Sequence, residues 1–329
     1  MSITVAVIGA GMMGRIHAQA WAEQPGVRVG AVADADESRA AAVAERFGAQ
    51  VLVNADEAMV GAQVVSICTP PHLHAEQVEQ AAALGADILL EKPAAFTATD
   101  YDRMQSAIER HGVRLMVGMT GRYYPEGQAA LATVRSGALG SLVAYAEHMH
   151  FDASELPDWY FQRHVAGGGV LLTNGIHSID RVLWLLQPRE VRVLAATLRS
   201  LAGRGDVEDF ADLLLDCDGL LCRIQLLWQA GAGATRAVEL VGAQGTLRME
   251  LYRGLIVTGR TGQREEWPYP QDADFLERTL IGIRAEVAAL LAARTAGLPA
   301  PSPLAENRRV FDLISSIYQR DRYGSGANL

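Results

Sequence analysis

Short apolar runs alternate with amphipathic stretches through the first 120 positions of the chain. The apolar runs fall at 3–8, 27–33, 51–53, 64–68, 88–90 and 114–119. The stretches at 15–23, 37–47, 72–84 and 97–111 carry apolar residues at helical spacing. Short buried strands that alternate with helices on short connections predict an α/β domain with a doubly wound parallel sheet.

The pattern changes after about residue 121. About seven strands are predicted, over 141–151, 190–199, 207–217, 220–229, 235–242, 246–252 and 254–259. Helices are predicted at 128–135, at 173–186 and twice near the C-terminus, the first of these with an apolar stripe of Phe275, Leu276, Leu280, Ile283, Val287 and Leu291. We therefore expect a Rossmann domain over 1–120 and an α+β domain over 121–329, whose large, mostly antiparallel sheet leaves one face open.

A glycine-rich turn follows the first apolar run directly. It reads Gly9-Ala10-Gly11-Met12-Met13-Gly14, which is G-x-G-x-x-G between a strand and a helix. The glycines permit a tight turn, approach of a pyrophosphate and close helix packing, and the helix offers its first N–H groups to phosphates. Asp34 ends the second strand and can accept hydrogen bonds from the ribose hydroxyls, which favours NAD. Arg39 could accommodate a 2′-phosphate and leaves NADP open.

Two further strand ends carry proline, at Thr69-Pro70-Pro71 and at Glu91-Lys92-Pro93. Ligands in open α/β sheets lie outside the carboxyl ends of strands, so we expect both segments, and His74, beside the cofactor. His72 and His74 resemble a metal spacing, but no third ligand is near, and we expect no metal.

Oxidation of an alcohol needs a base near the reacting carbon, and His177 is the best candidate. It follows Gly167-Gly168-Gly169 and falls in the first turn of a predicted helix, with Thr173 four residues earlier on the same face. Packing alone would also explain a helix histidine. Lys92 could polarise the substrate oxygen or exchange a proton with His177, because burial and a cationic nicotinamide both lower a lysine pKa.

Several loop residues suit hydroxyl and sugar-face contacts. They are Arg122, Trp159, Tyr160 and Arg163, and an ordinary loop at a domain junction would look the same. His148 and His150 alternate along a strand, where they could line the pocket or pack on the sheet.

Composition narrows the choice of partners and compartment. The formal net charge is -9, from 29 basic and 38 acidic residues, and without a basic cluster we expect no nucleic-acid partner. No apolar run approaches the length of a membrane span, and no basic segment precedes a leader-like stretch. Cys68, Cys217 and Cys222 form no C-x-x-C pair, which suits a reducing compartment, so we expect a cytoplasmic protein.

These motifs, in this order, resemble the glucose–fructose oxidoreductase / inositol dehydrogenase / rhizopine-catabolism (Gfo/Idh/MocA) family. The likeness covers nearly all of the chain, at 6–17, 68–74, 91–93, 137–140, 167–180 and 241–246. It implies a Rossmann domain followed by an open-faced sheet domain, and dimers or tetramers built through those sheets. It also implies NAD(P)-dependent oxidation or reduction of sugars and polyols.

The resemblance places the family's lysine at Lys92 and its usual histidine at His177. Many members carry an aspartate four residues before that histidine, whereas this chain has Thr173, followed by Asn174. Threonine cannot take a proton but can bond a hydroxyl, so we expect Thr173 and Asn174 on the substrate side, and proton transfer by Lys92 and His177.

We therefore expect an NAD(P)-dependent dehydrogenase of a sugar, polyol or inositol-like alcohol. An NAD-dependent glycoside hydrolase and a cofactor-binding regulator without turnover are the alternatives.

Overall fold

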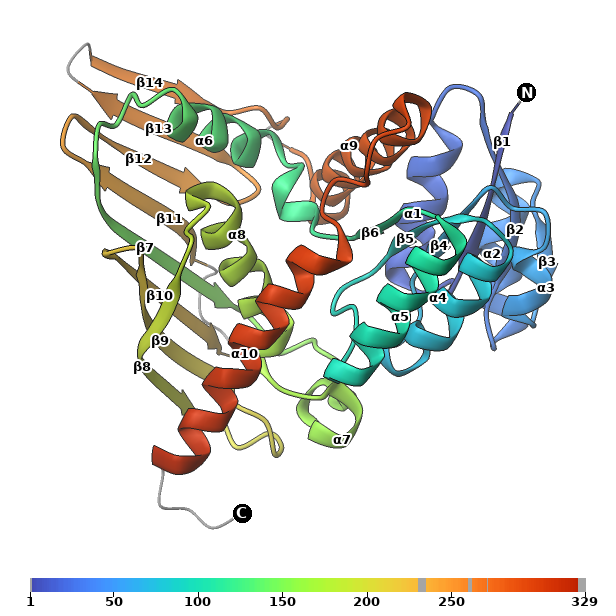
Figure 1. Cartoon of the computed structure of the whole chain (residues 1–329), viewed down its shortest axis with the longest axis horizontal. Coiled ribbons are helices and arrows are strands. Elements are labelled where there is room, and N and C mark those ends of the chain that lie inside the picture. The colour runs from blue at the N-terminus through green and yellow to red at the C-terminus, as the bar shows by residue number, and fades with distance from the viewer. Residues whose placement is uncertain (1, 230–234, 260–261, 271, 325–329) are drawn as a thin grey trace. The chain divides into compact units, whose positions relative to one another are not determined.

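The computed structural model describes residues 2–229, 235–259, 262–270 and 272–324 (Figure 1). By packing it divides into two compact units. The first comprises Met1–Tyr123 and Asp274–Arg309, and the second comprises Tyr124–Ala273 and Val310–Leu329.

The first unit is built on a six-stranded parallel sheet in the order β3-β2-β1-β4-β5-β6. Its strands are β1 (Ile3–Ile8), β2 (Val27–Ala33), β3 (Gln50–Leu52), β4 (Val64–Ile67), β5 (Asp87–Leu90) and β6 (Leu115–Val117). The strand order reverses between β1 and β4, and ligands bind at such a switch point, outside the carboxyl ends of the strands. The Rossmann prediction is confirmed.

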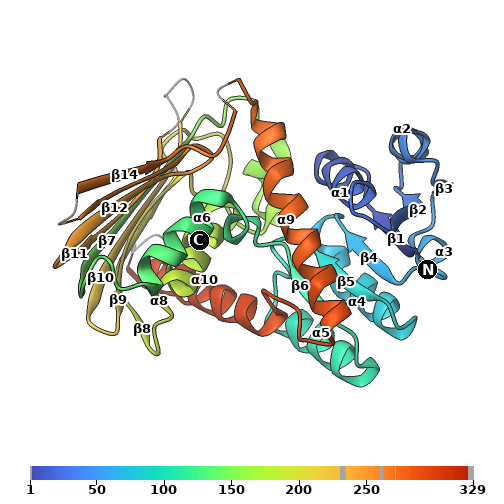
Figure 2. The ribbon, with the colours of Figure 1, turned by 90° about the horizontal axis from the view of Figure 1, so that it is seen from above.

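Helices cover both sides of this sheet. They are α1 (Met12–Ala22), α2 (Glu37–Phe47), α3 (Ala55–Met59), α4 (His74–Ala83), α5 (Ala98–His111) and α9 (Phe275–Ala296). In Figure 2, α1 and α2 lie on one side of the strands, and α4 and α5 on the other. The short α3 was not predicted, because a single turn of helix shows no apolar period.

Helix α9 packs in the first unit, although the sequence prediction grouped it with residues 121–329. Ile283, Val287 and Leu290 are buried in the same core as Trp21 of α1. Two residues of its predicted stripe, Phe275 and Leu276, are instead exposed. An apolar stripe shows that a helix buries one face but does not show against which core.

The second unit contains an eight-stranded sheet in the order β14-β13-β12-β11-β7-β10-β9-β8. Its strands are β7 (Leu142–Phe151), β8 (Val191–Arg199), β9 (Phe210–Cys217), β10 (Leu220–Trp228), β11 (Thr235–Gly242), β12 (Gly245–Glu250), β13 (Gly254–Gly259) and β14 (Gly262–Glu266). Only the pair β7–β10 is parallel, so the mostly antiparallel sheet is confirmed. Strand β14 was missed because its five residues show no apolar alternation and it lies at the sheet edge.

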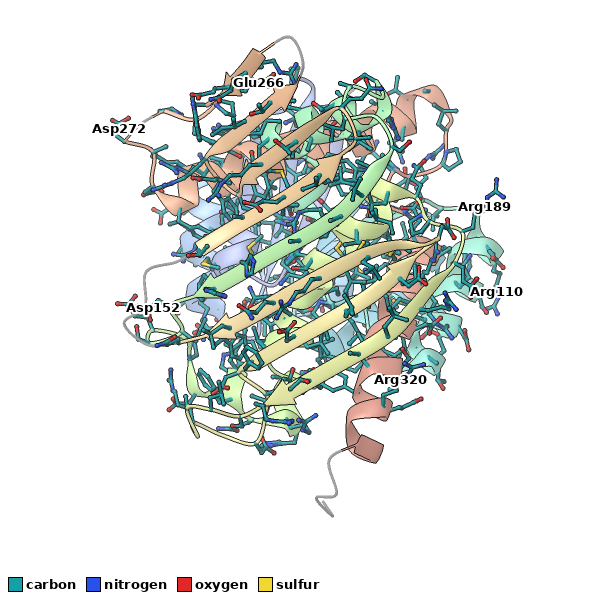
Figure 3. All side chains as sticks on the ribbon, turned by 90° about the vertical axis from the view of Figure 1, so that its left-hand side faces the viewer. Arg110, Asp152, Arg189, Glu266, Asp272 and Arg320 are labelled. Atoms are coloured by element: carbon teal, nitrogen blue, oxygen red, sulfur yellow. The ribbon has the colours of Figure 1, made fainter. Side chains whose placement is uncertain are left out.

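Helices lie on one face of this sheet, as Figure 1 shows. They are α6 (Pro125–Arg135), α8 (Ile176–Leu186) and the second-unit part of α10 (Leu304–Gly324). Figure 3 views the opposite face, where the strands run across the front and no described helix of this unit covers them. Among the helices described, none is long and apolar enough to cross a membrane.

Candidate active site

The three motif glycines have different surroundings. A Cβ at Gly14 would lie 1.8 Å from the Gly9 carbonyl oxygen, and one at Gly9, where φ is +92°, would lie 2.7 Å from the Cys68 carbonyl carbon. A Cβ at Gly11 would meet no atom within 4 Å. The fold itself therefore requires Gly9 and Gly14, whereas none of the described residues fills the space beside Gly11.

Helix α1 begins beside this space. Its N-cap residue, Gly11, provides no side-chain acceptor for the first N–H groups, which include those of Met12 and Met13. Such a helix terminus binds phosphate through N–H groups and the helix dipole. The residues present therefore fit the pyrophosphate of a dinucleotide.

Asp34 is held at the same turn. One carboxylate oxygen accepts the Ala10 N–H at 2.7 Å, and the other accepts the Asp36 N–H at 2.9 Å. Arg39, on α2, forms an exposed ion pair with Asp36 at 3.1 Å. The acid predicted to recognise the ribose thus sits at the glycine turn, and the guanidinium that could accommodate a 2′-phosphate is paired with a different carboxylate.

The segment after β4 is joined to the segment after β5 through His74, which is fully buried. Its Nε2 lies 2.8 Å from the Thr69 carbonyl oxygen and its Nδ1 lies 3.1 Å from the Ala94 carbonyl oxygen. Burial lowers the pKa of His74, although both carbonyl contacts oppose that change. The Thr69 hydroxyl donates to Gln77 at 2.5 Å. His74 therefore ties together the two strand ends that carry Pro70, Pro71 and Lys92.

Glu91 and Lys92 directly follow β5. Glu91 is buried, and its Oε1 lies 3.0 Å from Nε2 of His17, while its Oε2 accepts the Lys92 backbone N–H at 3.1 Å. Lys92 is half-buried. Burial lowers the pKa of Lys92, and the Glu91 carboxylate partly opposes that effect. For Glu91, burial favours the neutral acid, but His17 and then Lys92 outweigh it and keep its pKa below the usual value.

Lys92 is also the only lysine of the chain, since the other 28 basic residues are all arginine. A guanidinium cannot lose its proton in a protein, whereas a partly buried ammonium can. Among the lysine and arginine side chains, Lys92 at the end of β5 is therefore the one that can release a proton.

In the second unit, Thr173 and Asn174 lie in a π-helical turn, η4 (Leu171–Gly175), directly before α8. The α-helix predicted from residue 173 is therefore wrong in its first turn, although His177 does lie in the first turn of α8. Such turns occur often at functional sites. Thr173, Asn174 and His177 are half-buried.

A buried carboxylate holds the approach to this turn. Oε1 of Glu208 accepts the backbone N–H groups of Gly169 at 2.9 Å and Leu171 at 3.1 Å, and the Tyr318 hydroxyl at 2.7 Å. A Cβ at Gly169 would lie 1.8 Å from the Glu208 carbonyl oxygen. Close packing and these hydrogen bonds thus fix the glycine-rich segment before the π-helical turn.

Aromatic side chains surround Asn174. The Trp228 indole N–H donates to Oδ1 of Asn174 at 2.7 Å, and Tyr160, on the short helix η3 (Asp158–Phe161), stands edge-on to Trp228. Trp159 stacks on Tyr160 with ring centroids 3.9 Å apart and is largely exposed. Trp228, which the sequence did not single out, therefore contacts both Asn174 and Tyr160.

The other predicted substrate residues lie elsewhere. Arg163 begins the short helix α7 (Arg163–Ala166) and faces Glu208, with 3.7 Å between Nη2 and Oε2. Arg122 is buried in the first unit and forms an ion pair with Glu306 at 2.5 Å. The structure thus places Arg122 in the unit opposite to the one expected.

His148 and His150 lie on the sheet face opposite to α8. Glu147, between them on β7, accepts a hydrogen bond from Ser178 of α8 at 2.6 Å and contacts Arg181 of the same helix. Since side chains alternate along a strand, the two histidines point to the other face. His150 contacts Gln225 there, so packing on the sheet is the better interpretation. In the part of the chain that the structure describes, no group of three or more histidine, cysteine or acidic residues could hold a metal.

Sequence reasoning missed three buried polar residues near Lys92. They are His17 on α1, Ser66 in β4 and Glu286 on α9, each of which interrupts an otherwise apolar buried face. A polar residue at such a position is the signal that could have found them, because burial of a polar group is costly unless it is bonded.

This combination of a dinucleotide turn and a half-buried lysine at a neighbouring strand end defines an NAD-binding oxidoreductase. The model for the oxidoreductase family with an NAD-binding Rossmann fold matches residues 3–119, and the GFO/IDH/MocA C-terminal domain model matches residues 128–248. The chain therefore belongs to the Gfo/Idh/MocA family of oxidoreductases, as the sequence motifs predicted.

Individual relatives agree with this assignment. Inositol 2-dehydrogenase 2 of Saccharopolyspora erythraea is 33% identical over 83% of this chain and 82% of its own length. Inositol 2-dehydrogenase of Rhizobium meliloti is 29% identical over 89% of each chain. A levoglucosan dehydrogenase, solved with NADH and levoglucosan, matches the fold with a TM-score of 0.87 at 24% identity, over 99% of this chain and 98% of its own.

Proposed function

We propose that this oxidoreductase transfers a hydride between NAD and a secondary alcohol or ketone of a sugar, polyol or inositol-like substrate. The observation that carries the proposal is Lys92, the sole lysine, half-buried at the end of β5 on the sheet edge that also presents the glycine turn and Asp34. The names of the relatives support the substrate class, since they include inositol, D-apiose and levoglucosan dehydrogenases.

Bound nicotinamide supplies the hydride acceptor or donor. The role of Lys92 is to bond the reacting oxygen and to exchange its proton. Burial lowers the pKa of Lys92, which brings the neutral amine closer to working pH. The Glu91 carboxylate partly opposes this lowering, because it stabilises the charged ammonium.

His177 is assigned to the same reaction as the partner base. Thr173 and Asn174 are assigned to substrate hydroxyls, because neither side chain takes a proton and both can donate and accept hydrogen bonds. Tyr160 and Trp228 suit the apolar face of a sugar ring. Arg163 is also assigned to the substrate side, whereas the buried ion pair of Arg122 with Glu306 gives no support to a substrate role for Arg122.

Two further proposals concern assembly and location. The open sheet face of the second unit supports a homodimer or homotetramer. The three free cysteines support a cytoplasmic location. Sedimentation analysis and cell fractionation test them separately.

The test of function is NADH formation from NAD with a panel of inositols, aldoses and polyols. We expect turnover in the wild type, and a loss of at least about 100-fold in kcat for Lys92→Met and His177→Ala. Lys92→Arg keeps a positive charge but cannot release a proton, so we expect it to be as inactive as Lys92→Met. Wild-type turnover in both Lys92→Ala and His177→Ala would refute the assignment.

Three outcomes distinguish the alternatives. NADH accumulation supports the dehydrogenase. Glycoside cleavage without accumulated NADH supports the hydrolase. Tight NAD binding without consumption of any substrate supports the regulator.

A further inference from the structure

Within the first unit, a line of buried polar side chains runs from α1, the helix that follows the glycine turn, to Lys92. Nδ1 of His17 lies 2.8 Å from the Ser66 hydroxyl, and Nε2 lies 3.0 Å from Oε1 of Glu91. The other Glu91 oxygen accepts the Lys92 backbone N–H at 3.1 Å. His17 and Ser66 are fully buried, and Glu91 is 6% exposed.

These contacts join three elements that meet at the nucleotide edge. His17 lies on α1, whose first turn faces the pyrophosphate space beside Gly11, while Ser66 lies in β4 and Glu91 directly follows β5. We propose that His17 is a positioning residue for Lys92: it holds the Glu91 carboxylate in the orientation that fixes the Lys92 backbone and presents a negative charge to the ammonium. This inference rests on the proposed function, in which Lys92 exchanges the proton.

The charges around the line agree with this role. Burial opposes protonation of His17, but Cys68 and the Glu91 carboxylate outweigh it and raise the pKa of His17 well above its usual value. An imidazolium beside an ionised Glu91 is a charge-assisted pair, which is stronger and more directional than a neutral hydrogen bond. Such a pair restricts the carboxylate to one orientation.

A second carboxyl group, Glu286 of α9, faces His17 and Glu91. Thr120 donates to its Oε2 at 3.2 Å, and its Oε1 has no hydrogen-bond partner among the described residues. Burial, with a contribution from Glu91, raises the pKa of Glu286 to about 8, so the group is neutral at pH 7. His74 also senses the Glu91 carboxylate, and burial lowers the pKa of His74.

The two ring nitrogens of His17 permit a matched pair of variants. His17→Gln places an amide donor near the position of Nε2 and can still bond Glu91, whereas His17→Asn reaches only the position of Nδ1 and Ser66. We expect His17→Asn to lower kcat by about 10- to 100-fold, the effect typical of residues that orient a ligating side chain through a hydrogen bond. We expect His17→Gln to retain most of the wild-type kcat.

A purely structural role predicts a different result. Tyr101→Phe is the control, because it removes another buried hydrogen bond of the first unit, from the Tyr101 hydroxyl to Asn307 at 2.6 Å. We expect it to lower stability and to leave kcat unchanged. Equal losses of kcat in His17→Asn and His17→Gln, scaling with stability, would overturn the proposal.

The single lysine allows a direct readout that does not depend on turnover. Protein labelled with ¹³C at lysine Cε gives one lysine NMR signal, whose titration reports the pKa of Lys92. We expect Glu91→Gln to lower that pKa, because the carboxylate is the group that opposes burial. His17→Asn should shift the titration in the wild-type background and add nothing in the Glu91→Gln background, because residues that act as one unit are not additive.

Because the pKa of Glu286 is raised to about 8, the measurement is repeated in a Glu286→Gln background, where we expect the same coupling. Shifts from His17→Asn that are equal with and without Glu91, or absent in both, would overturn the proposal. If the Lys92 variants kept full turnover while the NMR coupling was present, the proposed function would fail and the coupling would stand.

Discussion

Gly11 and Gly14 belong to the same turn, but an added methyl group meets opposite surroundings at the two positions. At Gly14 the new Cβ would lie 1.8 Å from the Gly9 carbonyl oxygen, well inside van der Waals contact with backbone. At Gly11 no protein atom lies within 4 Å of the new Cβ, and the backbone there, with φ of -65° and ψ of -163°, suits alanine. The two alanine variants therefore separate the requirement of the fold from that of the cofactor.

The expected magnitudes differ accordingly. In Gly11→Ala, the loss of unfolded-state freedom stabilises by about 0.4–1 kcal/mol. Replacement of an N-cap glycine by alanine costs about as much, so we expect a net change within about 0.5 kcal/mol. The methyl group would occupy the space that the pyrophosphate needs, and we expect Kd for NAD to rise at least about tenfold, or about 1.4 kcal/mol. Gly14→Ala forces backbone to move, and we expect a loss of roughly 3 kcal/mol of stability.

Isothermal titration with NAD and urea unfolding of the same samples measure both quantities. Gly259→Ala in β13 is the control, since among the described residues its Cβ would meet only the Gln244 carbonyl oxygen at 3.9 Å. We expect Kd for NAD to stay unchanged and stability to rise by at most about 1 kcal/mol. If Gly11→Ala bound NAD as tightly as the wild type, the pyrophosphate would not approach this backbone, and the assignment of the turn would be wrong. A stable Gly14→Ala variant would contradict the packing argument.

Three further predictions concern the carboxyl groups of Asp34, Glu286 and Glu208. Asp34→Ala should weaken NAD binding and improve NADP binding relative to NAD, and an unchanged ratio of the two Kd values would contradict the ribose assignment. Between pH 4.5 and about 8 the folded chain keeps a Glu286 proton that the unfolded chain has lost, so wild-type stability falls as pH rises through that window. Over that window the free energy of unfolding of Glu286→Gln should therefore rise relative to the wild type by up to roughly 1.4 kcal/mol per pH unit. A difference between the two proteins that does not change with pH in urea unfolding would refute this. Tyr318→Phe removes one donor to Glu208 and should cost about 1 kcal/mol, whereas Glu208→Ala strands three donors and should cost about 3 kcal/mol. Equal losses in unfolding experiments would count against that network.

Local signals carried much of the fold. The alternation of short apolar strands with helices in the first 120 residues is a local pattern, and it predicted every strand of the parallel sheet. The same pattern could not assign α9 to a unit, because its apolar stripe specifies a buried face and not a partner. It also missed β14, whose polar residues at a sheet edge show no alternation.

The candidate site divides in the same way. Gly9, Gly11, Gly14, Asp34 and Lys92 were found because each lies in a short segment that follows a strand, which the sequence marks with glycine, acid or proline. Composition held a further signal, since a chain with 28 arginines has one lysine. The orientation of Arg122 and of the two β7 histidines could not be predicted, because each depends on contacts between distant segments.

The sequence by itself thus determined the class of fold, the cofactor turn and the position of Lys92, because strand period, turn chemistry and proline act between near neighbours in the chain. Only the tertiary structure decided what surrounds that lysine. His17, Ser66, Glu91 and Glu286 come from four elements spread over 270 residues, and burial sets their protonation. Which of these groups are buried against one another depends on contacts between distant segments in the packed core, and the local pattern of the chain does not specify it.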